Sequence, residues 1–354
     1  MTTAPAPAYQ AADLIIFGAR LFESAGLPPD RADIVGRLLV EADLMGHSTH
    51  GLQLAGAYLD SIEKGLMTVD GDPDVIADRG AVVTWDGRRL PGVWLTAMGL
   101  DLGIERAKTH GSATVVIRHS HHIACLAAYL SRATDAGCMA IIASSDPSEC
   151  SVAPFGGRRA IFTPDPIAIG MPTGGDPILV DISASITTNG MTGRLKGAGE
   201  RYPGAWALDA DGHPTDDPAA VLADPPGTIL PLGGTEYGHK GYGLALMIEA
   251  LTQGLGGFGR ADETTAWGAS VFIQVFDPDA FGGLSGYTRQ MGWISDACRE
   301  TPSVPGGEAV RLPGERALAR KREALEHGLV LHPGIMDGLQ PHAERLGVTP
   351  PAPL

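Results

Sequence analysis

The chain has 354 residues, 44% of them hydrophobic, and a formal net charge of −15 at pH 7. The length allows one large domain or two, and the apolar content is close to the average of globular proteins, which favours a folded chain over a disordered one. The acidic balance argues against nucleic acid or an anionic membrane surface as partner, although an acidic protein can still hold a local basic pocket for an anionic substrate.

Cysteine usage and the start of the chain indicate the compartment. None of the four cysteines lies in a C-x-x-C pair, and their spacings match neither a zinc site nor a disulfide framework. We therefore expect reduced thiols and a cytoplasmic location. No basic segment followed by an apolar one reads as a signal peptide, and no apolar run has the length of a membrane span.

The first 65 residues read as helical. Apolar spacing predicts a helix over residues 9–25, a second that Pro28-Pro29-Asp30 opens and that ends near Gly46, and a third over residues 53–64. Each ends near a glycine, as helices commonly do.

The middle of the chain alternates between strands and helices. The predicted strands are 81–85, 113–118, 139–144, 161–162, 167–171, 178–182 and 270–276. The predicted helices are 96–110, 125–136 and 240–255. The last of these has few polar residues, so we expect it to be buried.

A helix with a charged face follows over residues 314–327. Because both ends read as helical and the middle as mixed, we expect a fold of the α+β or mixed α/β class. Residues 1–75 and 300–354 are predicted to form one discontinuous helical domain, and residues 76–299 a second domain.

Two histidine clusters carry the main chemical information. Five of the eleven histidines lie in His47-Ser48-Thr49-His50-Gly51 and His119-Ser120-His121-His122. Imidazole exchanges protons near neutral pH, so the clusters predict a proton-transfer site. His122 follows a strand and precedes a helix, whose dipole would favour the neutral ring. By strand alternation, His119 and His121 should point away from it or into solvent.

The alternative hypothesis, that these histidines bind a metal ion, has less support. His47 and His50 are one helical turn apart, but no H-E-x-x-H motif and no acidic third ligand accompanies them, so no metal site is expected. Ordinary nucleotide and hydrolase motifs are also missing: there is no G-x-G-x-x-G, no G-x-S-x-G, and the near P-loop at 233–238 continues with histidine instead of lysine.

Two further segments each allow two interpretations. Asp181 ends an apolar strand, where an acid either binds a ribose hydroxyl or caps a turn or helix. The segment 238–243, Gly-His-Lys-Gly-Tyr-Gly, is expected at a helix start, where it either binds phosphate or allows close packing of the helix.

Several segments, taken in order, resemble the malate/L-lactate dehydrogenase family. The segment 41–52 resembles the family's A-D-x-x-G-x-x-S-H-G-L, and 118–122 resembles R-x-S-x-H. Further similar segments are 153–157, 166–169, 204–209, 214–218, 230–234, 239–244 and 311–316. The family includes sulfolactate and ureidoglycolate dehydrogenases, diketogulonate reductase and piperideine-carboxylate reductase.

The resemblance implies an NAD(P)-dependent oxidoreductase that transfers a hydride between nicotinamide and a 2-hydroxy/2-oxo acid or a cyclic imino acid. It implies a non-Rossmann cofactor domain (76–299) with a largely antiparallel mixed sheet, and a helical domain for substrate and dimerisation. A homodimer with its site near the subunit interface is expected. The cofactor is NAD or NADP, and the positions that match cofactor-binding residues are Ser145, Asp181, Ile182, Ser183, His239, Lys240, Gly314, Glu315 and Arg316.

By the same resemblance, His122 and His50 are the catalytic pair. We expect His122 to be the acid/base and His50 to orient or polarise the carbonyl. Thr49 takes the place of the family's serine beside the substrate.

One departure concerns substrate binding. The family arginine that grips the substrate carboxylate is Leu54 here, and a second common basic position is Ala57. Either Arg118, Arg158 or Arg159 binds the acid, or the substrate is larger or less charged. Two other functions stay open: a metal-dependent hydrolase or lyase that uses the histidine clusters, and a cofactor-binding relative without the usual activity.

Overall fold

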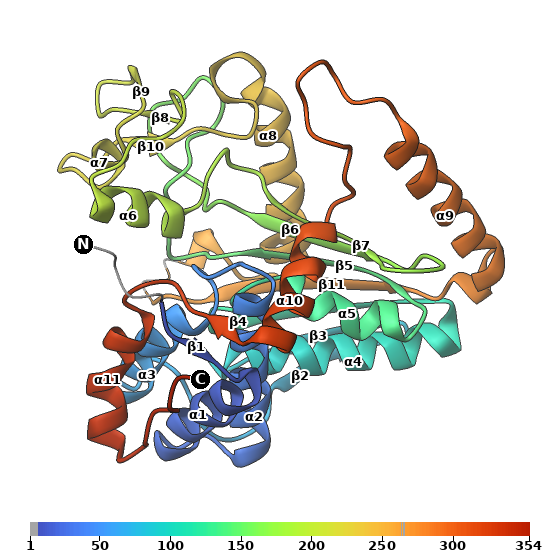
Figure 1. Cartoon of the computed structure of the whole chain (residues 1–354), viewed down its shortest axis with the longest axis horizontal. Helices are drawn as coiled ribbons and strands as arrows, with labels where there is room; N and C mark the ends of the chain where they lie inside the picture. The colour runs from blue at the N-terminus through green and yellow to red at the C-terminus, as the bar shows by residue number, and fades with distance from the viewer. Residues whose placement is uncertain (1–5, 263, 265) are drawn as a thin grey trace.

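The computed structural model describes residues 6–262, 264 and 266–354, and its centre is a seven-stranded sheet (Figure 1). The strands, in sheet order, are β2 (Asp74–Asp78), β3 (Val82–Asp86), β4 (Ser112–Ser120), β11 (Ala269–Phe276), β5 (Met139–Ser145), β6 (Pro166–Met171) and β7 (Ile178–Ser183). Only β3 and β4 are parallel neighbours, and every other adjacent pair is antiparallel. The predicted mixed, largely antiparallel sheet is confirmed.

Strand β11 determines where the site forms. It lies between β4 and β5 and is antiparallel to both, so these two strands, which α5 (Ala127–Asp135) connects in the sequence, are separated in the sheet by a strand from much later in the chain. Ser120 at the end of β4 and Ser145 at the end of β5 both pair with the first residues of β11. The segments that follow β4 and β5 and precede β11 therefore meet at one edge of the sheet.

Both faces of the sheet are covered (Figure 1). Helices α4 (Gly92–His110) and α5 pack on one face, and α8 (Gly234–Glu249), continued by a π-helical turn over Ala250–Gly254, lies on the other. Side chains alternate along β4, so Val115 and Ile117 join one core while Val116 joins the other.

The two ends of the chain pack together beneath the sheet (Figure 1). Helices α1 (Ala11–Ser24), α2 (Pro29–Leu44), α3 (Ala55–Glu63), α10 (Glu315–His327) and α11 (Ile335–Leu346) contact one another there. A short ladder joins β1 (Ala8–Tyr9) to β12 (Leu329–Val330). A 3-10 turn over Leu52–Leu54 leads into α3 and replaces the start of the third predicted helix.

The remaining elements lie around the opposite side of the sheet. They are α6 (Asn189–Ala198), α7 (Pro218–Val221), α9 (Leu284–Glu300) and a small sheet of β8 (Ala207–Leu208), β9 (Pro214–Thr215) and β10 (Thr228–Ile229). No helix in the described ranges is both long and apolar enough to cross a membrane.

The prediction for residues 240–255 was wrong in two respects. The helix begins at Gly234, so the segment 238–243 is inside it and not at its start. A side chain at Gly241 would overlap the backbone of Leu232 and Ala184, which is the close packing that was the alternative to a phosphate site. The helix is also buried on one side only, since Tyr237 is 58% exposed and Leu246 48%.

Packing of α1 on α2 generates a stability prediction. A Cβ at Gly36 would lie 2.7 Å from the backbone nitrogen of Ala19 and 3.0 Å from the carbonyl oxygen of Ile15. Gly36→Ala should therefore destabilise the protein by about 1–3 kcal/mol, because the two helices must separate. In α11, Gly338 has open space around its Cβ position, so the matched Gly338→Ala should stabilise by about 0.5–1 kcal/mol. Urea unfolding of both variants checks this, and equal effects would contradict the packing account.

Candidate active site

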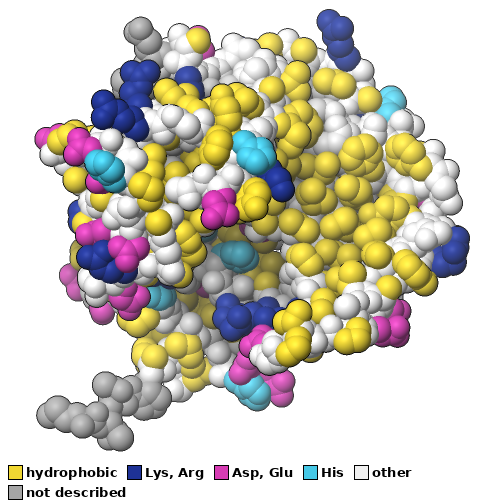
Figure 2. Space-filling model, turned by 90° about the horizontal axis from the view of Figure 1, so that it is seen from above, with side chains coloured by type: hydrophobic (Ala, Val, Ile, Leu, Met, Phe, Trp, Pro, Cys, Tyr) yellow, Lys and Arg dark blue, Asp and Glu magenta, His cyan; other side chains and the backbone are white. Residues whose placement is uncertain are grey.

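A cavity of 720 Å³ opens at the sheet edge where β4 and β5 end. Its lining comes from the loop after α2, the segment after β4, the ends of β5 and β7, helix α6 and the residues before β11. Figure 2 shows this face hollowed near its centre, with histidine inside the hollow and a broad apolar surface beside it. The volume is in the range of small-molecule and cofactor sites.

His122 is held as a neutral hydrogen-bond donor. Its Nδ1 accepts from the hydroxyl of Tyr58 at 2.7 Å and from the backbone N–H of Ala124 at 3.3 Å. Because a backbone N–H can only donate, the proton of the neutral ring lies on Nε2. The ring stacks on Trp267, with 4.7 Å between centroids. Burial, and then the neighbouring imidazoles of His50 and His121, lowers the pKa of His122 well below its ordinary value.

His50 lies on the same cavity, with 6.0 Å between its ring centroid and that of His122. Its Nδ1 is 2.8 Å from the hydroxyl of Thr49, a group that either donates or accepts. Burial, with smaller effects of His47 and Arg194, lowers the pKa of His50 to about 4. The structure thus brings the two predicted catalytic histidines together, both as neutral rings at pH 7.

The turn that carries His50 is fixed by Asp43 at the end of α2. The buried Asp43 carboxylate accepts from the backbone N–H of Leu52 at 2.7 Å, while its Oδ1 has no partner among the described residues. A Cβ at Gly51 would lie 2.3 Å from that carboxylate, so only glycine fits there. Burial raises the pKa of Asp43 to about 7, against the opposing effects of Leu52 and Arg194.

His121 does not line the cavity, but the alternative prediction, that it points into solvent, was wrong. It is 1% exposed, and its ring meets Tyr58 and Trp267 edge-on at 5.3 and 5.1 Å between centroids. Neither ring nitrogen has a partner within the described part of the chain. Burial lowers the pKa of His121 to about 3. His119 does point away from the cavity, toward Asp86, at 2.9 Å.

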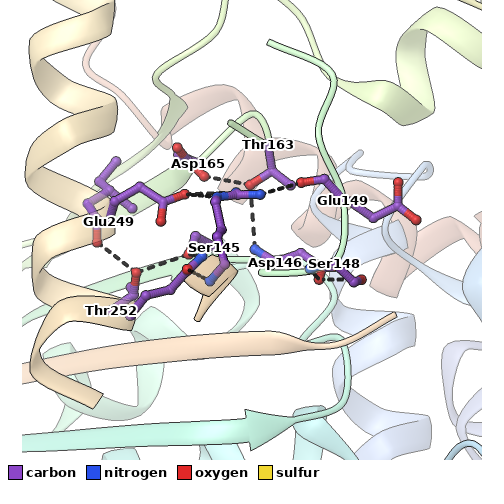
Figure 3. A network of polar contacts seen from close by, with 11 residues as sticks. Ser145, Asp146, Ser148, Glu149, Thr163, Asp165, Glu249 and Thr252 are labelled. Atoms are coloured by element: carbon purple, nitrogen blue, oxygen red, sulfur yellow. Dashed lines mark hydrogen bonds and ion pairs between the residues drawn. The ribbon is translucent and has the colours of Figure 1, made fainter. Parts of the chain in front are cut away.

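Four of the predicted cofactor residues line the cavity: Ser145, Asp181, Ile182 and Ser183. Asp181 Oδ2 accepts from the backbone N–H of Ala127 at the first turn of α5, the capping contact that was one of its two readings. Ser145 belongs to the polar network of Figure 3. Its hydroxyl accepts from Gln253 at 2.7 Å and lies 3.1 Å from the hydroxyl of Thr252, which joins it to the π-helical turn.

The same network places carboxylates on the cavity wall (Figure 3). Asp146 accepts from both the backbone N–H and the hydroxyl of Ser148 at 2.8 Å, and burial raises its pKa. Arg260 joins the wall to α8, donating to Glu249 and to the backbone carbonyl of Glu149. Asp146 and Glu149 both line the cavity, so this part of the wall is acidic.

Other predicted residues do not line the cavity in the described structure. Arg118 donates to Asp86 at 3.0 Å, and Arg158 and Arg159 are exposed elsewhere. Outside the cavity also lie His239 and Lys240 on the exposed side of α8, and Gly314, Glu315 and Arg316 at the start of α10.

Arg194 on α6 supplies a basic group to the cavity, in which Leu54 stands at the position of the family's substrate-binding arginine. Among the described residues it is the only arginine or lysine that lines the cavity. Its guanidinium donates to the hydroxyl of Ser48 at 3.0 Å and to the side-chain oxygen of Gln53 at 2.6 Å. Gln53 immediately precedes Leu54, which also lines the cavity together with Thr49.

Arg194, Tyr58 and Trp267 were not predicted from the sequence. Arg194 lies in a segment with three glycines that no apolar spacing marks as a helix, although Thr188 caps it by accepting from the backbone N–H of Met191. Tyr58 shows only as an apolar position of α3, and Trp267 only as a residue before a strand.

Comparisons with known proteins show which family this chain resembles over nearly its whole length. A family model described as malate/L-lactate dehydrogenase matches residues 9–340. The (2R)-3-sulfolactate dehydrogenase (NADP(+)) of Chromohalobacter salexigens is 34% identical, covering 91% of this chain and 93% of its own. The L-lactate dehydrogenase of Cupriavidus necator is 30% identical, covering 92% and 94%.

Solved structures of a reductase and a dehydrogenase have the same fold as this chain. The delta1-piperideine-2-carboxylate reductase from Pseudomonas syringae pvar. tomato superposes with a TM-score of 0.81 at 28% identity, covering 95% of this chain and 99% of that one. The malate dehydrogenase from Entamoeba histolytica shares the fold, with a TM-score of 0.91 at 24% identity over 97% of this chain and 99% of that one. The fold, together with similarity to these enzymes over more than 90% of the chain, places the protein among dehydrogenases whose cofactor domain is not of the Rossmann type. The chain belongs to the malate/L-lactate dehydrogenase family.

The buried histidines make the free energy of unfolding fall as the pH is lowered. An imidazole that stays neutral in the folded state, as at His121 with its pKa of about 3, stabilises fully above pH 6.5, and the benefit is lost as pH falls toward 3 because the unfolded chain binds the proton. His121→Phe keeps an aromatic ring there but removes the ionisable group. The slope of the free energy of unfolding against pH should therefore be smaller in the variant by about 1.4 kcal/mol per pH unit between pH 6 and 4. Urea titrations across this range measure the slope. Parallel profiles for variant and wild type would contradict the assignment.

Proposed function

We propose that this chain is an NAD(P)-dependent oxidoreductase that transfers a hydride between nicotinamide and a 2-hydroxy/2-oxo acid or a related imino acid. The observation that carries the proposal is the pair of neutral imidazoles, His50 and His122, on one cavity. Family membership supports it, since similar proteins are named lactate, malate and sulfolactate dehydrogenases and a piperideine-carboxylate reductase.

The cavity wall fits a dinucleotide. Hydroxyl and amide groups suited to ribose and phosphate oxygens come from the end of β5, from β7 and from the segment after it; these are Ser144, Ser145, Ser183, Ser185, Thr187, Thr188 and Asn189. Trp267 and Ile182 add apolar surface to the same wall. Of the predicted cofactor residues, Ser145, Asp181, Ile182 and Ser183 would hold the cofactor here. A bound nicotinamide supplies or accepts the hydride.

Hydrogen bonding assigns different roles to the two histidines. His122 Nδ1 already accepts from the N–H of Ala124, which opposes a second proton on this ring, so Nε2–H donates to the substrate carbonyl and polarises it. His50 faces a hydroxyl that suits either protonation state, so it gives the proton to the nascent alkoxide and takes it back in the reverse direction. This proposal exchanges the roles expected from the sequence.

A proton must reach His50 before reduction, because burial keeps its pKa at about 4. An anionic 2-oxo acid beside the ring favours the charged imidazole and raises that pKa. Substrate binding and proton uptake are thus coupled, and the protonated His50 forms beside the carbonyl that it must protonate.

Arg194 is the proposed grip on the substrate carboxylate. It replaces the arginine that the family places at Leu54, and it reaches the same side of the cavity from α6. A guanidinium matches a carboxylate with two parallel hydrogen bonds. Thr49, next to His50, contributes a hydroxyl at the same end.

Assembly as a homodimer and a cytoplasmic location complete the proposal. Helices α8 and α9 expose large apolar side chains, with Tyr237 58% and Trp293 68% exposed, on the side that Figure 2 shows as broadly apolar. A second copy would cover such a surface. His239, Lys240 and residues 314–316 would then serve the neighbouring copy's cofactor, with 1–75 and 300–354 as the substrate and dimerisation domain. Neither nucleic acid nor membrane is a proposed partner, given the net charge of −15.

Nicotinamide absorbance during turnover of a panel of 2-oxo acids tests the function. His50→Asn should lower kcat/KM by about 100- to 10,000-fold and remove one ionisation from the pH profile, because the proton donor is gone. The matched His122→Asn keeps an N–H donor, so it should retain that ionisation and more activity. The opposite pattern would restore His122 as the acid/base.

Two other outcomes would overturn the function as a whole. Chelator-sensitive hydrolysis or lyase activity without nicotinamide would favour the metal-dependent alternative. Dinucleotide binding with no turnover of any panel member would favour a relative without the usual activity.

Arg194→Met should raise KM for a 2-oxo acid by about 10- to 100-fold, because a charged hydrogen-bonding pair is lost, while KM for the dinucleotide stays unchanged. Leu54→Arg should raise activity toward small acids such as pyruvate and restore binding in the double variant. An unchanged KM in Arg194→Met would mean that the carboxylate is held elsewhere.

A further inference from the structure

Three side chains that the proposed reaction leaves without a catalytic role converge on one wall of the cavity. His47 comes from the loop after α2, Cys125 from the segment before α5, and Asp181 from β7. One ligand atom from each lies within 4.8 Å of the other two. All three also line the cavity, so any ion held there would face its interior.

The arrangement is ordered by contacts on its buried side. The Cys125 thiol is buried and donates to Asp181 Oδ2 at 3.8 Å, and the same oxygen accepts from the N–H of Ala127 at 2.9 Å. Burial raises the pKa of both the thiol and the carboxyl. His47 is half-buried on a loop, and one of its ring nitrogens lies within 4.8 Å of both the thiol and the carboxylate.

The donor set selects a class of ion. Imidazole nitrogen, thiolate sulfur and carboxylate oxygen together are ligands of zinc-class cations, whereas magnesium and calcium require oxygen. Tetrahedral bonds of about 2.0–2.3 Å place such donor atoms roughly 3.3–3.7 Å apart. The 3.8 Å between Cys125 Sγ and Asp181 Oδ2 is already close to that spacing, and the His47 nitrogen, which lies within 4.8 Å of both atoms, must approach by at most about 1 Å to bond the same ion.

We propose that His47, Cys125 and Asp181 form a binding site for a zinc-class divalent cation, with its fourth position open to the cavity. On binding, the S–H bond of Cys125 breaks, its proton passes to solvent, and the thiolate bonds to the ion. The bound ion uses Asp181, one of the proposed cofactor-binding residues, as a ligand and projects into the cavity. The ion and the dinucleotide therefore cannot bind at the same time. This last consequence rests on the proposed function, whereas binding of the ion does not.

Cobalt binding tests the site directly. Co²⁺ added to chelator-treated full-length protein should bind at one ion per chain with a thiolate-to-cobalt charge-transfer band, and Zn²⁺ should displace it. Cys125→Ser should abolish the band and weaken Zn²⁺ binding by about 100-fold or more. Cys150→Ser, which removes an exposed cysteine outside the cavity, is the matched control and should bind as wild type. Absence of the band, or its survival in Cys125→Ser, would overturn the proposal.

A second variant guards against a folding defect in the first. His47→Gln alters a half-buried loop residue and should weaken Zn²⁺ by a similar factor with an unchanged circular dichroism spectrum. Undiminished affinity would remove His47 from the site. In the activity assay, Zn²⁺ should inhibit competitively with the dinucleotide, and less so in Cys125→Ser. Equal inhibition of that variant would refute the site, while absence of any turnover would count against the proposed function alone.

Discussion

The hydrogen bond between the buried Asp43 carboxylate and the backbone N–H of Leu52 is the constraint on which the site depends. It ties the end of α2 to the following 3-10 turn, and the carboxylate lies so close to Gly51 that no side chain fits there. Between them, the N–H of His47 donates to the carbonyl of Ala42 and that of His50 to the carbonyl of His47, so the segment is a series of hydrogen-bonded turns. His50, the adjacent hydroxyl of Thr49 and the Ser48 contact of Arg194 all take their places from this short segment.

The second half of the site depends on the sheet edge. Antiparallel insertion of β11 brings the segment after β4 beside the residues before β11, which places His122 against Trp267. The backbone N–H of Ala124 then determines which nitrogen of His122 carries the proton, and Tyr58, from a helix near the N-terminus, contacts the same ring nitrogen. One histidine is positioned by a helix-terminal turn and the other by a strand edge, and the cavity is the space between these two independent supports.

Apolar periodicity predicted much of the fold. The first two helices and the strands β4, β5 and β11 have strong stripes or alternation, and their predicted bounds lie within a few residues of those observed. The same reasoning missed α9, although Leu284, Tyr287, Met291 and Ile294 recur there at helical spacing, and misplaced the start of the glycine-rich α8. His50 and His122 were predicted because their clusters are visible in the sequence. Arg194 and Trp267 reach the cavity, and Tyr58 reaches His122, only through tertiary packing, which no local pattern encodes.

The position of β11 between β4 and β5 has a consequence for how the chain is made. The two strands it joins are complete by residue 145, but their partner ends at Phe276, so the middle of the sheet cannot close until well over a hundred further residues have been synthesised. Until then β4 and β5 present open backbone edges, which are templates for association with other chains. Such non-local pairing also slows folding. The strand that completes the active-site edge is thus also the step at which a nascent chain is most exposed to aggregation.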